Sequence, residues 1–301
     1  MSFDEGAGLD IDQVTGGGGG GFGRGGVVIG GGLGTLLIVL LGAFFGVDLS
    51  GVVQTSPLDP GNVQPEQGST EQFSHCKTGA DANRDAECRV IGTVNSVQAF
   101  WNDALPAQQR RQYRAAKTVI YHGATQSACG TASNDAGPFY CPSDERVYID
   151  ATFFDLLTQR FGADDGALAQ EYVVAHEYGH HVENILGLLG QAQDGTTGPR
   201  SGSVRVELMA DCFAGVWANH ASSTISDTGK PFLKPLTRED INSALSAAAA
   251  VGDDHIQQSS MGGVREDAWT HGSSESRQKW FLAGYKSGQS DSCDTFAVDT
   301  P

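Results

Sequence analysis

The strongest chemical signal in this sequence is the segment His176-Glu177-Tyr178-Gly179-His180, which has the spacing H-E-x-x-H. Residues four apart share one face of an α-helix, so both imidazoles can bind a single metal ion. Glu177 then lies beside the open metal position, where its carboxylate can accept a proton from a metal-bound water. The combination predicts a Zn²⁺ site that activates water as a nucleophile at neutral pH.

Catalytic zinc needs a third protein ligand and one open coordination position. His181 is a poor candidate, because a residue next to His180 points about 100° away around the helix. Glu207 is a better one, since it lies four residues before Asp211 in a mostly apolar helical segment, where carboxylates need partners. We expect Glu207 to bind the metal and Asp211 to hydrogen-bond the distal nitrogen of a ligand histidine. The two roles could also be exchanged.

A further group must stabilise the negative charge that develops on the scissile carbonyl oxygen. His271 precedes a predicted helix in a Gly/Ser-rich turn and could donate a hydrogen bond to this oxygen. Arg277 and Tyr148 are the other candidates, although either could serve only in pairing or packing. We take His271 as the candidate catalytic residue beside Glu177. The strand predicted at 146–150 is interpreted as an edge strand that could pair with an extended peptide.

Helices outnumber strands in the folded part of the sequence. Apolar periodicity and capping residues predict helices over 94–104, 152–161, 165–186, 204–220, 237–250 and 274–287. Short runs of β-branched and aromatic residues predict strands at 118–121 and 147–150. The expected fold class is therefore α+β, helix-rich with a small sheet.

The first quarter of the chain differs in composition from the rest. Residues 1–26 are rich in glycine and contain several acidic residues, which predicts a disordered tail. Residues 27–47 carry no charge and are long enough to cross a bilayer as a helix. We interpret them as a transmembrane helix and not a signal peptide, since the preceding tail is long and acidic. Residues 48–75 would be a linker, and 76–301 the folded domain.

The charged residues indicate which classes of partner to exclude and how the chain would be oriented in a membrane. The 301 residues include 19 Lys+Arg and 36 Asp+Glu, a net charge of −17, which argues against nucleic-acid binding. Arg24 stands just before the apolar segment, so the positive-inside rule places the short N-terminus in the cytoplasm. The expected location is the cell membrane, crossed once, with the folded domain outside the cytoplasm.

The cysteines support an oxidising compartment. All six follow the apolar segment, and their even number suits disulfides. A cysteine zinc site is the competing interpretation, but the sequence contains no C-x-x-C. Short spacings favour local pairs and leave two cysteines to close a long loop, while other connectivities stay open. The favoured pairs are Cys76/Cys88, Cys129/Cys141 and Cys212/Cys293.

Several segments together resemble the neutral zinc metallopeptidases of bacteria, a membrane-anchored family with a Gly-rich N-terminus. They are spread over most of residues 76–296 and are GPFYCPSDERVYID (137–150), EYVVAHEYGHHVENILG (171–187), RVELMADCFAGVWA (205–218), VGDDHIQ (251–257) and HGSSESRQKWFLAGY (271–285). The resemblance implies a zincin-like, gluzincin-type peptidase domain. It also implies that His176 and His180 bind zinc, that Glu177 is the base, and that a carboxylate of the E-x-x-x-D segment completes the site.

The expected function is therefore that of a membrane-anchored zinc peptidase acting on a peptide or protein substrate. The alternative is a non-catalytic zincin-fold scaffold or adaptor in the cell envelope, with zinc structural or absent. Glu177 counts against this alternative, because a structural site needs no general base and is usually closed by four protein ligands.

Overall fold

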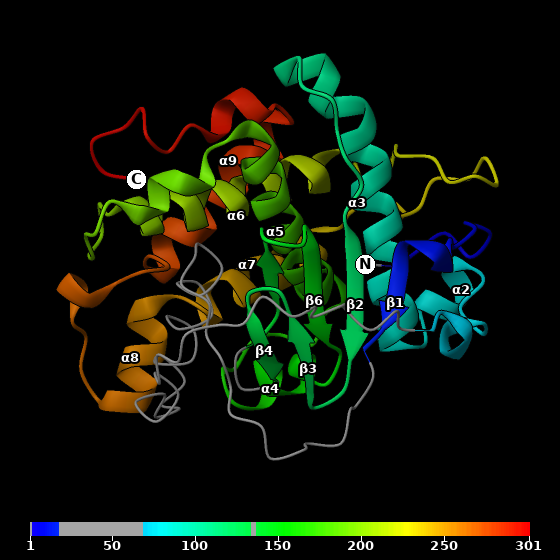
Figure 1. The fold of residues 1–301 in the computed structure, drawn as a ribbon, viewed down its shortest axis with the longest axis horizontal. Coiled ribbons are helices and arrows are strands. Elements are labelled where there is room, and N and C mark those ends of the chain that lie inside the picture. Colours follow the sequence, from blue (N-terminus) through cyan, green and yellow to red (C-terminus); the bar gives the residue numbers. More distant parts are fainter. Residues whose placement is uncertain (1, 18–68, 134–136) are drawn as a thin grey trace, which may run out of the picture.

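The computed structural model describes residues 2–17, 69–133 and 137–301. Within these ranges a small sheet lies against a group of longer helices (Figure 1), so the helix-rich α+β class is confirmed. The α-helices are α2 (Gly79–Ala82), α3 (Ala86–Gln109), α4 (Phe153–Gln159), α5 (Ala167–Leu186), α6 (Gly202–His220), α7 (Arg238–Ala250), α8 (Asp253–Met261) and α9 (Ser274–Ser287). The strands are β1 (Val14–Gly16), β2 (Lys117–Tyr121), β3 (Ala124–Ser127), β4 (Gly130–Ser133), β5 (Phe139–Cys141) and β6 (Arg146–Asp150).

The main sheet has the strand order β1-β2-β6-β5. β1, β2 and β6 run parallel, and β5 pairs antiparallel with β6. The strand at 146–150 is thus paired on both sides, and the prediction that it is an edge strand is wrong. The edge beside it is β5, a strand of three residues that sequence periodicity could not detect, because so short a run contains barely one alternation.

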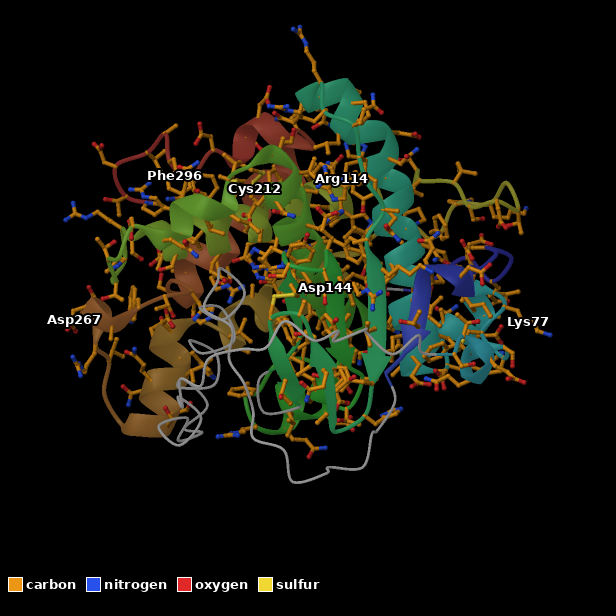
Figure 2. All side chains as sticks on the ribbon, in the orientation of Figure 1. Lys77, Arg114, Asp144, Cys212, Asp267 and Phe296 are labelled. Atoms are coloured by element: carbon orange, nitrogen blue, oxygen red, sulfur yellow. A yellow bond between two sulfur atoms is a disulfide. The ribbon has the colours of Figure 1, made fainter. Side chains whose placement is uncertain are left out.

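Alternating side chains give the main sheet two different faces. Ile120 of β2 and Ile149 of β6 belong to the large core under the helices. Their neighbours Tyr121 and Tyr148 point to the opposite face, into a small separate core. The β3–β4 hairpin contributes Ala132 to that small core, so it covers the face of the sheet away from the helices. Side chains fill the space between the layers (Figure 2).

The helices that carry the candidate site cross one another closely. A Cβ atom at Gly179 of α5 would lie 2.8 Å from the Cα and 2.9 Å from the backbone oxygen of Ala210 in α6. A Cβ at Gly284 of α9 would overlap the backbone oxygen of Cys212, also in α6. Glycine at these two positions therefore allows the backbone of α6 to approach the backbones of α5 and α9 closely. This close approach fixes where the side chains of α6 lie relative to α5.

The prediction of a disordered tail is wrong for residues 2–17, which pack against the folded domain. Phe3, Ala7 and Val14 are fully buried, and β1 extends the sheet beside β2. Asn95 of α3 accepts a hydrogen bond from the backbone N–H of Asp10 at 2.8 Å and donates one to its carbonyl oxygen at 3.0 Å. Composition was misleading because this polar segment pairs with distant parts of the chain, such as Asn95 of α3 and strand β2.

The predicted linker is partly corrected as well. Residues 69–75 are described and include a 3₁₀ helix at Glu71–Phe73, in which Phe73 is fully buried. The folded domain therefore begins before Cys76. The remainder of the predicted linker lies outside the described residues.

The predicted membrane crossing needs a larger correction. Residues 27–47 lie outside the described ranges, and none of the helices inside those ranges is both long and apolar enough to cross a bilayer. In addition, β1 and β2 are neighbours in one sheet, whereas a single crossing between them would place them on opposite sides of a membrane. The predicted single-pass location in the cell membrane is therefore wrong.

Other predictions are confirmed. The disulfides are Cys76–Cys88, Cys129–Cys141 and Cys212–Cys293, the three favoured pairs. α9 has the predicted bounds, and α5 ends at the predicted residue, Leu186, before Gly187, whose φ of 76° suits glycine. α7 begins at Arg238, one residue after the predicted start, and Thr237 and Asp240 form a capping box there.

Candidate metal centre

Two crossing helices bring the predicted metal ligands together. α5 carries His176 and His180 one turn apart, and α6 carries Glu207. The Nε2 atom of His176 lies 3.2 Å from Glu207 Oε2, and the Nε2 atom of His180 lies 3.6 Å from Glu207 Oε1. The ligand atoms of all three residues lie within 4.8 Å of one another. All three side chains are buried, as a preorganised site requires.

Each histidine is oriented by a carboxylate of its own. The Nδ1 atom of His176 lies 2.8 Å from Asp211 Oδ1, which is the position predicted for Asp211. The Nδ1 atom of His180 lies 2.8 Å from Glu183 Oε2. Because each Nδ1–H is used by a carboxylate, both Nε2 atoms face Glu207, where a bound metal ion would take their lone pairs. The sequence analysis missed the role of Glu183, although the signal was local: the residue three after a ligand histidine lies on the same helix face.

Asp211 is held in turn by Arg277 of α9. Arg277 donates from Nε to Asp211 Oδ2 at 2.8 Å and from a terminal nitrogen to Asp211 Oδ1 at 2.9 Å. The Tyr172 hydroxyl also donates to Asp211 Oδ1. Burial disfavours ionisation of Asp211, but the charges of Arg277 and His176 hold its pKa below the ordinary value. Arg277, a candidate for stabilising the oxyanion, is therefore engaged with the carboxylate that orients His176.

The charge balance of the cluster favours a cation. Burial disfavours the charged form of His176, but Asp211 and Glu207 raise its pKa to about 10. Burial also opposes ionisation of Glu207, yet His180, His176 and His271 hold its pKa well below the usual range. Without a metal, protons on the histidines thus supply the positive charge that buried carboxylates need. Two imidazole nitrogens and one carboxylate form a donor set that zinc commonly takes in catalytic sites, so the residues present fit this metal.

Glu177 lies beside this cluster as the next residue of α5. Its side chain is buried, with 7% exposed, and burial raises its pKa above the ordinary value. A carboxylate with a raised pKa is a better proton acceptor near neutral pH than an exposed one. The position and environment of Glu177 therefore suit a general base.

His271 is fixed in a buried loop by Asp253, the first residue of α8. Asp253 Oδ2 accepts the backbone N–H groups of Thr270, His271 and Gly272 at 2.8, 2.7 and 2.8 Å. Asp253 Oδ1 lies 3.3 Å from His271 Nδ1, and the Thr270 hydroxyl lies 2.9 Å from the same nitrogen. The charge of His271 contributes to the low pKa of Glu207, which places the two side chains within electrostatic range.

Tyr148, the remaining candidate for stabilising the oxyanion, is bonded to another group. The Tyr148 hydroxyl donates to Asp144 at 2.7 Å, and its ring stacks on Phe139 in the small core behind the sheet. Arg277 and Tyr148 are thus both bonded to other groups, and His271 is the candidate that lies within electrostatic range of Glu207. Asp253 had no assigned role in the sequence analysis, because it acts on a loop 17 to 19 residues further along the chain.

Comparisons with known proteins identify the family of this chain. The sequence model of a family described as "Putative neutral zinc metallopeptidase" matches residues 6–296. The chain is 49% identical over 254 residues to the uncharacterised protein Rv2575 of Mycobacterium tuberculosis, covering 84% of each chain. It is 38% identical over 273 residues to the uncharacterised protein YpfJ of Escherichia coli K12, covering 88% of this chain and 86% of the relative. No solved structure matches it significantly. Since the family model spans nearly the whole chain, including the segment that forms β1, this protein belongs to the neutral zinc metallopeptidase family.

Proposed function

We propose that this protein is a zinc-dependent peptidase with a zincin-type site, and that it hydrolyses peptide bonds in a peptide or protein substrate. The observation that carries the proposal is the convergence of His176, His180 and Glu207 within 4.8 Å, with Glu177 next in sequence to the first ligand. A scaffold would need neither a buried carboxylate at Glu177 nor a buried histidine, His271, within electrostatic range of Glu207.

Each residue of the site has its own role in the proposed hydrolysis of a peptide bond. When bound, Zn²⁺ supplies Lewis acidity, which polarises a carbonyl group and acidifies water. The Nε2 atoms of His176 and His180 and the carboxylate of Glu207 would hold it. The Glu177 carboxylate accepts a proton from the attacking water and later delivers it to the leaving amine nitrogen. His271 donates from Nε2 to the carbonyl oxygen as negative charge develops there.

The edge strand β5 is the best candidate for binding the substrate backbone. The Tyr140 hydroxyl of β5 lies 3.0 Å from His181 Nδ1 and accepts from Asn184 Nδ2 at 3.0 Å, which ties this strand to α5 just past His180. Within the described part of the sheet, β5 pairs only with β6. An extended peptide could add to its outer side through main-chain hydrogen bonds.

Hydrolysis of a peptide mixture by the zinc-loaded full chain tests the proposal. Glu177→Gln should keep the zinc content of the wild type and lower kcat by about 10²–10⁴-fold, the usual contribution of a general base. Glu207→Ala should lose zinc, measured by elemental mass spectrometry. Glu239→Gln, the same exchange at an exposed position of α7, should change neither property.

Two results would contradict the proposal. Wild-type turnover in Glu177→Gln would remove the proposed base. A zinc-loaded wild type that cleaves no peptide in the mixture would instead favour the scaffold alternative, in which the metal has only a structural role.

A further inference from the structure

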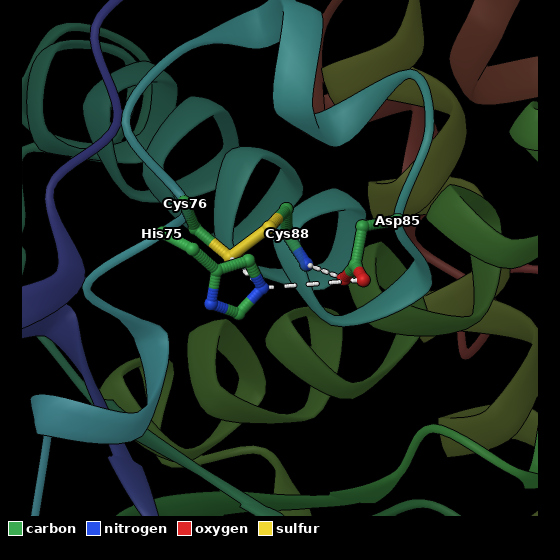
Figure 3. A group of neighbouring side chains, drawn as sticks. All are labelled: His75, Cys76, Asp85 and Cys88. Carbon is green, nitrogen blue, oxygen red and sulfur yellow. Dashed lines mark hydrogen bonds and ion pairs between the residues drawn. A yellow bond between two sulfur atoms is a disulfide. The ribbon is translucent and has the colours of Figure 1, made fainter.

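A second group of metal-binding side chains lies at the start of α3, apart from the candidate metal centre. It consists of His75, Cys76, Asp85 and Cys88, whose ligand atoms all lie within 4.8 Å of one another (Figure 3). In the structure the two cysteines form a disulfide. We propose that this group is a redox-controlled zinc site, which binds Zn²⁺ when the Cys76–Cys88 disulfide is reduced.

The histidine is oriented as a metal ligand would be. His75 Nδ1 lies 3.2 Å from the backbone oxygen of Gln72, which accepts the Nδ1–H. This contact leaves Nε2 as the donor atom, the arrangement that supports most metal-bound histidines. His75 Nε2 lies 3.5 Å from Cys76 Sγ and 4.0 Å from Asp85 Oδ2. Figure 3 shows the imidazole ring next to the disulfide, with a dashed line from the ring to the carboxylate of Asp85.

Asp85 can bind a metal without giving up its structural role. Its Oδ1 atom accepts the backbone N–H of Cys88 at 2.9 Å and so caps α3, whereas Oδ2 is the atom that faces His75. Cys88 lies in the first turn of α3, where the partial positive charge of the helix end favours anionic ligands. One carboxylate oxygen and one sulfur of α3 are therefore already placed opposite His75 and Cys76.

Reduction of the disulfide by an ordinary dithiol is enough to free the two sulfur ligands. A dithiol transfers two electrons to the Cys76–Cys88 bond, which breaks to give two thiols while the dithiol becomes a disulfide. Zn²⁺ then replaces the two thiol protons, which pass to the solvent. Two thiolates, one imidazole and one carboxylate make four ligands, the closed set of a structural zinc site.

The two cysteines of this group are buried, whereas its histidine and aspartate are partly exposed. Cys76 and Cys88 are almost fully buried, with 1% and 0% exposed, so the sulfurs stay close together when the bond between them is broken. The side chains of His75 and Asp85 are 53% and 45% exposed, which gives an ion a path of entry. The disulfide and the zinc ion would therefore be alternative cross-links between residue 76 and α3, one for oxidising and one for reducing surroundings.

Cobalt substitution in the full chain tests this site separately from the candidate metal centre. Thiolates bound to Co²⁺ give intense near-ultraviolet charge-transfer absorption, whereas the two histidines and one carboxylate of the other site do not. We expect no such band in the oxidised chain and a clear band after reduction with a water-soluble phosphine. Elemental mass spectrometry should find one more zinc per chain in the reduced form than in the oxidised form.

Matched variants decide whether the four residues form the site. His75→Ala should weaken binding to the reduced form by more than about 100-fold, because loss of a ligand exceeds the usual effect of losing an outer hydrogen-bond partner. Asp85→Asn should also weaken it, while asparagine keeps the helix cap. Cys129→Ser/Cys141→Ser, which removes a different pair of thiols, should leave the band unchanged.

Three outcomes would overturn the proposal. One is a folded, reduced chain that shows no thiolate band. Another is a band that His75→Ala and Asp85→Asn leave unaltered, since this would indicate adventitious binding by thiols. The third is unfolding of the reduced chain in the presence of zinc, monitored by circular dichroism, because zinc is proposed to replace the lost cross-link.

Discussion

Arg277 and Asp211 form a buried ion pair directly behind a candidate metal ligand, with N–H···O distances of 2.8 and 2.9 Å. Arg277 lies on α9 and Asp211 on α6, so the pair joins α9 to the helix that carries Glu207. Asp211 Oδ1 is also the partner of His176 Nδ1. The orientation of His176 therefore depends on a guanidinium that is separated from it by about a hundred residues of sequence.

Arg277→Lys should weaken zinc binding. Lysine keeps the positive charge, so Asp211 is not left as an unpaired buried charge, but it lacks the planar fork that bonds both carboxylate oxygens. We expect a loss of about 10–100-fold in zinc affinity, the usual effect of disturbing an outer-shell partner. Competition with a chromogenic chelator measures it. Arg265→Lys, the same exchange at an exposed position, should have no effect, and unchanged affinity in Arg277→Lys would show that charge alone suffices.

Glu183→Gln should weaken zinc binding through the other histidine. Burial raises the pKa of Glu183 to about 7, while the charge of His180 opposes this rise. Glutamine can still accept the Nδ1–H of His180, but it no longer raises the basicity of that ring. A loss near the lower end of about 10–100-fold is expected. Asp211→Asn provides the matched comparison at His176. If Asp211→Asn weakens binding and Glu183→Gln does not, Glu183 has no role beyond packing.

The convergence of the residues of the candidate metal centre could be predicted because their signal is local. His176, Glu177 and His180 lie within one and a half turns of one helix, and Glu207 and Asp211 have the same four-residue spacing on another. A spacing of three or four residues is enough to place such side chains on one face. Glu183 has the same kind of signal and could have been found in the same way.

The supporting residues could not be predicted, because their contacts connect distant parts of the chain. Arg277 reaches Asp211 over 66 residues, and Asp10 meets Asn95 over 85. The strands β1 and β5 have three residues each, too few for a periodic pattern. Residues 2–17 look like a free tail in composition, since three buried apolar side chains are visible as a core only when the groups that cover them are known.

Asp253→Asn should reduce stability in a manner that depends on pH. Burial opposes ionisation of Asp253, but its bonds to His271 and to backbone N–H groups lower its pKa below 3.8. A lowered carboxyl pKa adds stability that is fully present above the unfolded-state pKa and is lost as the pH falls through the folded-state pKa. Urea unfolding should show Asp253→Asn less stable than wild type by about 1–3 kcal/mol at pH 7.

The difference between the two proteins should narrow at a pH well below 3.8, where the wild-type carboxyl is protonated as well. Asp164→Asn, at an exposed position, should follow the wild type at both pH values. A stability gap for Asp253→Asn that is the same in acid and at neutral pH would mean that the charge of Asp253 contributes nothing.

Gly179→Ala should disturb the metal centre, although alanine is the better helix former by about 1 kcal/mol. The added Cβ would lie 2.8 Å from the Cα of Ala210, so α5 and α6 must move apart, which draws Glu207 away from the two histidines. We expect a loss of about 1–3 kcal/mol in the free energy of unfolding, together with weaker zinc binding. Gly190→Ala, where no atom lies within 4 Å of the added Cβ, is the control. If Gly179→Ala is as stable as this control and binds zinc equally well, the close crossing of the helices does not set the ligand geometry.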